Sequence, residues 1–279
     1  MSDLEIKEYL SRIGIRKINE LDTALIETFG QEEGERHIAK LTALFDQSEE
    51  RLFYGSRDTV YLRRQEELVD YWNQSLQMSL LAASYYDRVF FRRTMEYLLR
   101  YDSFWSGDVI DIGCGNGILT CFLALRHPDG VITGLEISSN AMSVAEELAE
   151  RLSADNVHFS KPDALQQGKC DTLFSSRTVH ENVAWRALCE ELKMPALSME
   201  DQIRRHRQYA KELSVLVKPQ GYLVSVERYE DDGAYAGLVR ALECEGFSQV
   251  KGTHMQFSCK NGDGMAAFQA KIFQKTPIR

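Results

Sequence analysis

The sequence lacks Cys-x-x-Cys pairs, a net positive charge in either half and any long apolar run. Its six cysteines are scattered without a Cys-x-x-Cys pair, and no histidine stands at zinc-site spacing, so we expect reduced packing cysteines and no metal. No stretch approaches about 18 uncharged apolar residues, and the first ten residues are charged and lack the apolar core of a signal peptide. We therefore expect a cytoplasmic chain with no membrane partner.

Charge and composition narrow the class of protein further. The formal net charge is −9, from 33 lysines and arginines against 42 acidic residues, and neither half of the chain is basic. Nucleic acid is not an expected partner, because neutralising its phosphates normally requires a basic surface. With 44% hydrophobic and 27% charged residues, the chain has the composition of a folded globular protein.

Residues 1–105 have the pattern of helices. Apolar residues recur there at helical spacing, as in Ile38, Leu41, Leu44 and Phe45. No β-alternation of any length occurs in this part of the chain, and Gly14, Gly30 and Gly34 are expected to end or break helices. The sequence therefore predicts an all-helical N-terminal region.

From Gly107 onward, short apolar runs are separated by helical stretches. The expected strands are residues 109–112, 131–137, 157–159, 172–175 and 222–226. This alternation predicts βαβ units and an α/β fold, in which helices cover both faces of a mainly parallel sheet. Residues 248–258 and 265–274, on either side of a turn rich in Asn, Asp and Gly, predict a hairpin, so the last strand should run antiparallel.

The stretch VIDIGCGNG, from Val109 to Gly117, is the most informative part of the sequence. A buried strand ends there in an acid and then in alternate glycines, which allow a tight turn and the close approach of a ligand. The dinucleotide pattern G-x-G-x-x-G fails because Ile118 stands where the third glycine is needed, and no Gly-Lys-Ser/Thr of a P-loop follows. The leading carboxylate, Asp111, suits a nucleotide-like cofactor that carries an ammonium group.

This motif and four later segments resemble the class I methyltransferases that depend on S-adenosylmethionine. Glu136 in VITGLEIS stands where such enzymes bind the ribose hydroxyls, and Asp163, with Ala164 beside it, matches their acid at the adenine edge. CDTLFSSRTVHE is similar to their fourth strand and its exit loop. LVKPQGYLVSVE is similar to their turn into the fifth strand, with Gln220 in place of a glycine.

The resemblance implies a Rossmann-like, seven-stranded sheet over residues 106–279 and S-adenosylmethionine as cofactor. The residues that it places around the cofactor are Asp111, Gly113, Cys114, Gly115, Asn116, Glu136, Ile137, Asp163, Ala164 and Ser176. In this family, additions such as residues 1–105 commonly cover the cofactor pocket, and dimerisation through the same helices is an equal alternative. Tyr85 and Tyr86 would then supply aromatic walls for the acceptor, or simply pack the helices onto the sheet domain.

Catalysis of methyl transfer depends mainly on aligning the acceptor, the methyl group and the sulfur in a dry pocket. A base is needed only if the acceptor must lose a proton, and His180, followed by Glu181, is the candidate because histidine titrates near neutrality. His180 could equally pack or cap the next helix. Arg177 and Glu181 could bind a charged substrate or remain surface charges.

Three functions remain open from the sequence. The first is methylation of an oxygen or nitrogen of a small molecule, such as a secondary metabolite or a peptide. The second is methylation of RNA or protein, and the third is cofactor binding without turnover. The helix expected at residues 199–216 carries a basic run, Arg204 to Arg207 with Lys211, that either meets an anionic substrate or forms a solvated helix face.

Overall fold

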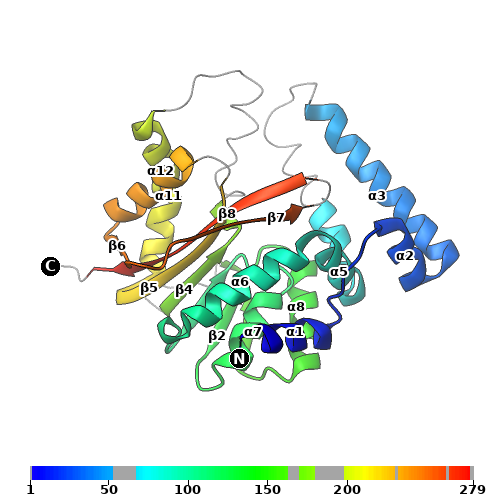
Figure 1. Cartoon of the computed structure of the whole chain (residues 1–279), viewed down its shortest axis with the longest axis horizontal. Coiled ribbons are helices and arrows are strands. Elements are labelled where there is room, and N and C mark those ends of the chain that lie inside the picture. Colours follow the sequence, from blue (N-terminus) through cyan, green and yellow to red (C-terminus); the bar gives the residue numbers. More distant parts are fainter. Residues whose placement is uncertain are drawn as a thin grey trace.

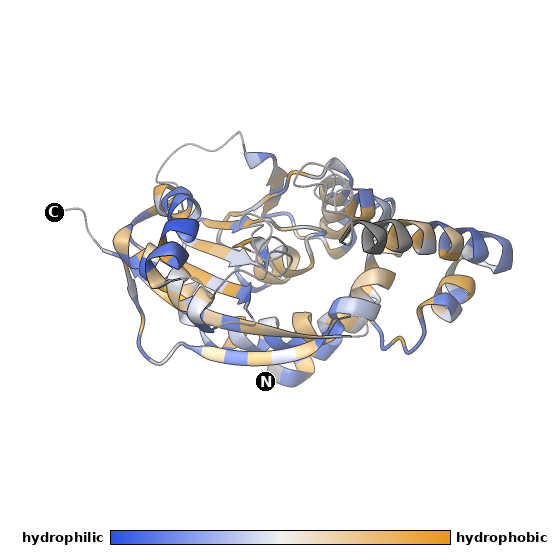
Figure 2. Cartoon of the chain, turned by 90° about the horizontal axis from the view of Figure 1, so that it is seen from above, coloured by the Kyte–Doolittle hydropathy of each residue, from blue (hydrophilic) through white to orange (hydrophobic). Residues whose placement is uncertain are grey.

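The computed structural model describes residues 2–52, 67–162, 170–179, 198–229, 232–261 and 264–276. Helices cover both faces of one sheet, and α2 and α3 extend to one side of it (Figure 1). Figure 2 shows that the strands are mostly apolar, whereas the helix surfaces turned away from them carry more polar residues. No helix in the described ranges is long and apolar enough to cross a membrane.

The strands of the described chain form one sheet in the order β3-β2-β1-β4-β5-β8-β6, with β7 paired to β8. Their bounds are β1 Val109–Ile112, β2 Ile132–Leu135, β3 Val157–Ser160, β4 Cys170–Ser176, β5 Val217–Arg228, β6 Phe247–Gln249, β7 Met255–Asn261 and β8 Gly264–Lys275. Strands β1 to β5 are parallel, and β1 lies between β2 and β4. The strand order therefore reverses at β1, and such a reversal opens a ligand crevice at the carboxyl ends of the strands.

The predicted fold class is confirmed, with one strand more than expected. Strand β8 is antiparallel to β5, β6 and β7, and β7 with β8 forms the predicted hairpin. The expected first arm, residues 248–258, is divided between β6 and β7, because the chain turns at Gly252, which has φ 76°. Over the described ranges the sheet thus has eight strands, where the resemblance implied seven.

The described part of the N-terminal region is helical, as predicted. It contains α1 Ser2–Ile13, α2 Leu21–Phe29, α3 Gln31–Leu52, α5 Leu76–Ala82, the π-helical turn η1 Ala83–Asp87, α6 Arg88–Arg100 and the short η2 Asp102–Phe104. Gly14 and Gly30 end α1 and α2 at positive φ. The break expected at Gly34 is wrong: Gly34 lies inside α3, and a Cβ there would fall 2.6 Å from the Ile26 Cα, so glycine lets α2 and α3 pack closely.

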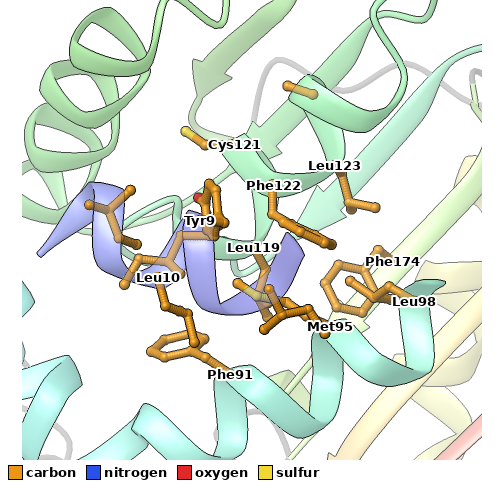
Figure 3. Close-up of a cluster of buried hydrophobic side chains, with 14 of the residues drawn as sticks. Tyr9, Leu10, Phe91, Met95, Leu98, Leu119, Cys121, Phe122, Leu123 and Phe174 are labelled. Atoms are coloured by element: carbon orange, nitrogen blue, oxygen red, sulfur yellow. The ribbon is translucent and has the colours of Figure 1, made fainter. Parts of the chain in front are cut away.

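Two buried clusters attach helices to the two faces of the sheet. The remaining helices are α7 Ile118–Arg126, α8 Ser139–Leu152, α11 Met199–Leu216 and α12 Asp232–Cys244. On one face, α1 and α6 pack against α7 and β4, and the Tyr9 hydroxyl donates a 2.6 Å hydrogen bond to the Ile118 carbonyl (Figure 3). On the other face, α11 and α12 cover β4, β5 and β8. Helices α1, α5 and α6 are therefore part of the same core as the sheet, whereas α2 and α3 pack against α5 in a separate buried cluster.

Candidate functional site

The glycine loop lies at the carboxyl end of β1, where the strand order reverses. Gly113, Gly115 and Gly117 have φ of 69°, 53° and 73°, a left-handed backbone that side chains other than glycine adopt at a cost. The amides of Gly113 and Cys114 both donate to the Leu135 carbonyl at the end of β2. These hydrogen bonds fix the start of the glycine loop against the end of β2.

The three glycines have different surroundings. A Cβ on Gly117 would lie 2.7 Å from the Ala145 Cβ, and one on Gly113 would lie 2.3 Å from the Thr178 Cγ2, so both face closely packed neighbours. A Cβ on Gly115 would meet no atom within 4 Å. Gly115 therefore faces open space, and a ligand can approach the loop backbone there.

Glu136 is held beside this open space by backbone amides. Its Oε2 accepts a 2.9 Å hydrogen bond from the Gly115 amide, and its Oε1 accepts from the amides of Ile137 and Ser138 at 2.7 and 2.9 Å. The next side chain, Ile137, is 67% exposed. A fixed carboxylate beside an exposed apolar side chain matches the needs of ribose hydroxyls and an aromatic base.

Asp111 is buried directly beneath the loop. It is 2% exposed, and the Thr120 hydroxyl donates a 2.6 Å hydrogen bond to its Oδ2. Burial raises the pKa of Asp111 to about 7, against the lowering effect of the Thr120 bond and with a smaller raising effect of the Glu136 charge. A ligand ammonium group would stabilise the ionised carboxylate. The role of Asp111 beside such a group stays a prediction.

N-terminal residues reach the glycine loop and the Glu136 side through individual contacts that the sequence did not predict. The Asn116 amide donates to the Ser79 hydroxyl of α5 at 3.0 Å. On the Glu136 side, the Ser138 hydroxyl donates to the Asp70 carboxylate at 2.8 Å, and the Asn140 amide donates to the Asp70 carbonyl at 3.2 Å. These are single polar contacts between distant segments, so no local sequence pattern could have indicated them.

The exit of β4 lies against the π-helical turn η1. Arg177, just after Ser176, has φ 63°, and its guanidinium pairs with Asp87 at 2.8 Å and lies 5.1 Å from the centre of the Phe90 ring. Tyr85 and Tyr86 precede Asp87 in the turn and contact each other edge to face. The structure therefore brings the predicted substrate residues Tyr85, Tyr86 and Arg177 into one region, and π-helical turns are frequent at functional sites.

A buried polar cluster lies behind this exit. Glu227 of β5 is fully buried and accepts hydrogen bonds from the Ser175 hydroxyl, the Thr178 hydroxyl and the Val179 amide. The Tyr209 hydroxyl of α11 is hydrogen-bonded to the Thr178 hydroxyl. Burial and the nearby Glu227 charge raise the pKa of Tyr209, which therefore keeps its proton. The only hint in the sequence is that polar Ser225 and Glu227 alternate with Val224 and Val226.

Several predicted residues lie outside the described part of the chain. They are Asp163, Ala164, His180 and Glu181. Cys114 lies inside it, and its Sγ packs towards β2, 2.9 Å from where a Cβ on Gly134 would stand. Within the described ranges, no group of three His, Cys, Asp or Glu side chains is placed to hold a metal ion.

Arg204, Arg207 and Lys211 of the basic run on α11 line one surface hollow together with Gln208 and Glu245, but His206 does not belong to this surface. His206 is buried, and its Nδ1 is hydrogen-bonded to the Gln202 carbonyl and its Nε2 to the Tyr229 hydroxyl. The prediction that the whole basic run faces a substrate or solvent is therefore wrong for His206. Burial lowers the pKa of His206. Arg204 and Arg207 are exposed and pair with Asp201 and Glu245, respectively.

A family model described as a methyltransferase domain matches residues 106–258. The chain belongs to this family. The match begins just before β1, extends into β7 and includes all the described residues of the cofactor side of the site. Membership implies S-adenosylmethionine as cofactor, and the open space at Gly115, the fixed Glu136 carboxylate and the buried Asp111 fit that molecule.

Curated relatives and solved structures are similar over parts of the chain. A ribosomal RNA small subunit methyltransferase C of Actinobacillus succinogenes is 34% identical over 90 residues, and a release factor glutamine methyltransferase of Chlorobaculum tepidum is 30% identical over 100 residues. These alignments cover 31% and 33% of this chain, but only 27% and 34% of the relatives' lengths. A structure from Pyrococcus horikoshii shares the fold, with a TM-score of 0.50 and 12% identity over 71% of this chain and 89% of that one.

Proposed function

We propose that this methyltransferase moves a methyl group from S-adenosylmethionine to an oxygen or nitrogen of a small-molecule acceptor, such as a secondary metabolite or a peptide. The cofactor would lie at the carboxyl ends of β1 and β2, and residues 1–105 would cap the pocket. The observation that carries the proposal is the open space at Gly115 between the fixed Glu136 and the buried Asp111.

Each residue on the cofactor side has a role in this arrangement. Asp111 would balance the ammonium group, Glu136 would bind the ribose hydroxyls, and Ile137 would pack against the adenine. When bound, S-adenosylmethionine supplies a methyl group already activated by a positively charged sulfur. The protein then contributes chiefly by orienting the acceptor and excluding water.

The acceptor side is proposed to lie between the exit of β4 and η1. Contacts of Asp70 and Ser79 with the loop regions, together with the Arg177–Asp87 pair, bring N-terminal residues to the pocket from different sides. This enclosure favours a small acceptor over a large one. Tyr85, Tyr86 and Arg177 would contact the acceptor, and His180, with Glu181 beside it, would take its proton where one must leave.

A matched pair of glycine substitutions tests the cofactor site. Gly115 and Gly252 both have positive φ, and a Cβ on either would meet no atom within 4 Å, so Gly115→Arg and Gly252→Arg place the same side chain in similar backbones. We expect Gly115→Arg to weaken S-adenosylmethionine binding by at least about 100-fold in calorimetry, because the side chain takes the ligand's space. Gly252→Arg should bind as the wild type does, and equal affinity in the two variants would refute the site.

The alternative acceptors are RNA and protein, which the names of the similar ribosomal RNA and release factor methyltransferases suggest. A cell extract can be separated into low-molecular-weight, RNA and protein fractions and incubated with the enzyme and S-adenosylmethionine labelled in its methyl group. Label in the low-molecular-weight fraction supports the proposal. Label confined to RNA or protein would favour the alternative.

A further inference from the structure

The sheet face beneath α11 and α12 changes from apolar to polar towards the carboxyl ends of the strands. Leu223 of β5 belongs to the apolar cluster with α11 and α12, and strand alternation places Ser225 and Glu227 on the same face. Both side chains are buried, and Glu227 is 0% exposed. Burying a carboxylate lowers the stability of the fold unless hydrogen bonds compensate for its lost hydration. The hydrogen-bond partners of Glu227 therefore show which part of the chain it holds in place.

The described hydrogen-bond donors to Glu227 come from one short segment. The Ser175 hydroxyl donates at 2.5 Å, the Thr178 hydroxyl at 3.4 Å and the Val179 amide at 3.1 Å. Ser175 and Thr178 are also hydrogen-bonded to each other at 2.7 Å. The carboxylate thus fixes the turn at residues 175–179 on its inner side, where the chain leaves β4.

The same turn touches the glycine loop on its other side. The Thr178 Cγ2 stands 2.3 Å from the position that a Cβ on Gly113 would occupy, so the threonine methyl packs against the glycine backbone. Thr178 therefore contacts the polar cluster through its hydroxyl and the glycine loop through its methyl group. A change in the hydroxyl's hydrogen bonds would move the methyl group and the loop that it supports.

We propose that Glu227 is a positioning residue that sets the affinity for S-adenosylmethionine by holding Thr178 against Gly113. This inference rests on the proposed placement of the cofactor at the glycine loop. Glu227 acts through Thr178, so the two side chains contribute to cofactor affinity as one unit and not independently.

A double-mutant cycle measured by calorimetry with S-adenosylmethionine tests this coupling. Glu227→Gln removes the charge, and Thr178→Val keeps the side-chain shape but removes the hydroxyl. We expect each to weaken binding by about tenfold, and the double variant to bind no more weakly than either single variant. Ser225→Ala, a change at a buried position on the same strand face, should leave the affinity unchanged. A purely structural role would lower the melting temperature without this non-additivity.

Two results would overturn the inference: wild-type affinity in Glu227→Gln, or losses that multiply in the double variant. If Glu227→Gln does not fold, Thr178→Val alone tests the inference. Binding of S-adenosylmethionine that is about tenfold weaker in folded Thr178→Val supports it, and wild-type affinity overturns it. The Gly115→Arg variant separates the two possible failures. If it too binds normally, the cofactor placement is wrong. If it loses binding while Glu227→Gln binds normally, only the role of Glu227 is wrong.

Discussion

The two ends of the proposed site, a cofactor end at the glycine loop and an acceptor end at the exit of β4, are built in different ways. At the cofactor end, Glu136 and Gly115 are 21 positions apart in the sequence, and Asp111 and Thr120 are 9 apart. At the acceptor end, Glu227 is 52 positions from Ser175 and belongs to a different strand. The carboxylates of the cofactor end are held by backbone amides and nearby residues, with Ser79 and Asp70 added from the N-terminal region, whereas the acceptor end depends on side chains from distant segments.

The difference is between backbone hydrogen bonds, which come with the fold, and side-chain contacts, which depend on the sequence of this chain. Backbone donors at the cofactor end are present in any chain whose loop adopts this path. Side-chain contacts at the acceptor end, such as Arg177 with Asp87, can change without loss of the fold. The two ends meet where Thr178 packs on Gly113, and substitutions at each end should therefore have distinct signatures.

The largest effect is expected for Glu136→Ala at the cofactor end. The change removes the acceptor of three backbone amides and the proposed partner of the ribose hydroxyls. Since hydrogen bonds to charged groups contribute about 1.5–3 kcal/mol each, we expect binding to weaken about 100-fold. Calorimetry with S-adenosylmethionine measures this loss. Glu146→Ala, at an exposed position of α8, is the control. Comparable cofactor affinity of the two variants would contradict the placement of Glu136 at the cofactor end.

Asp111→Asn should give a smaller effect that depends on pH. Because the pKa of Asp111 is raised to about 7, the carboxyl of the free protein ionises mainly as the pH rises from about 6 to about 8. The ionised form is the one that binds an ammonium group, so cofactor affinity should increase roughly tenfold over this range and then level off. Asp111→Asn should remove this increase. An unchanged pH profile in the variant would show that another group is responsible.

The same carboxyl affects stability with the opposite sign. Its folded-state pKa lies above the unfolded value, so the folded protein without cofactor holds the proton more tightly and loses stability as the pH rises from about 4 to about 7. Urea unfolding across this range should show the loss in the wild type and a smaller loss in Asp111→Asn. Equal losses in both proteins would contradict the assignment of this pH dependence to Asp111.

The sequence was sufficient to predict the strand and the glycine loop at the proposed cofactor end. Alternate glycines after a short apolar strand locate the loop, and the structure places Gly113, Gly115 and Gly117 at positive φ. The order of the apolar runs predicts the parallel strands, because their hydrophobic residues are contiguous. Gln220 has φ 68°, so the residue that replaces a glycine of the family keeps the left-handed backbone.

Contacts between distant segments could not be predicted in the same way. The contacts of Ser79 with Asn116 and of Asp70 with Ser138 join residues 37 and 68 positions apart, which no short pattern encodes. His206 stands among arginines in the sequence, but the helix turns it inward to Tyr229. A glycine in a helical pattern predicts a break, but Gly34 lies within α3 because glycine is needed there for the close approach of α2, which is a tertiary feature. Each difference arises from packing between elements distant in the sequence.

The smallest effect is expected for Asp87→Asn at the acceptor end. The pair with Arg177 is partly exposed, with side-chain exposures of 38% for Arg177 and 22% for Asp87, so its loss should lower the free energy of unfolding by about 1 kcal/mol or less. Cofactor affinity should stay within about twofold of the wild type. Because the pair joins η1 to the exit of β4, hydrogen exchange should quicken at residues 83–100 and 176–179. The control is Asp3→Asn, which breaks the pair between Lys7 and Asp3 within α1 and should leave hydrogen exchange in both segments unchanged. Equal exchange rates in the two variants would show that the Arg177–Asp87 pair does not hold these segments together.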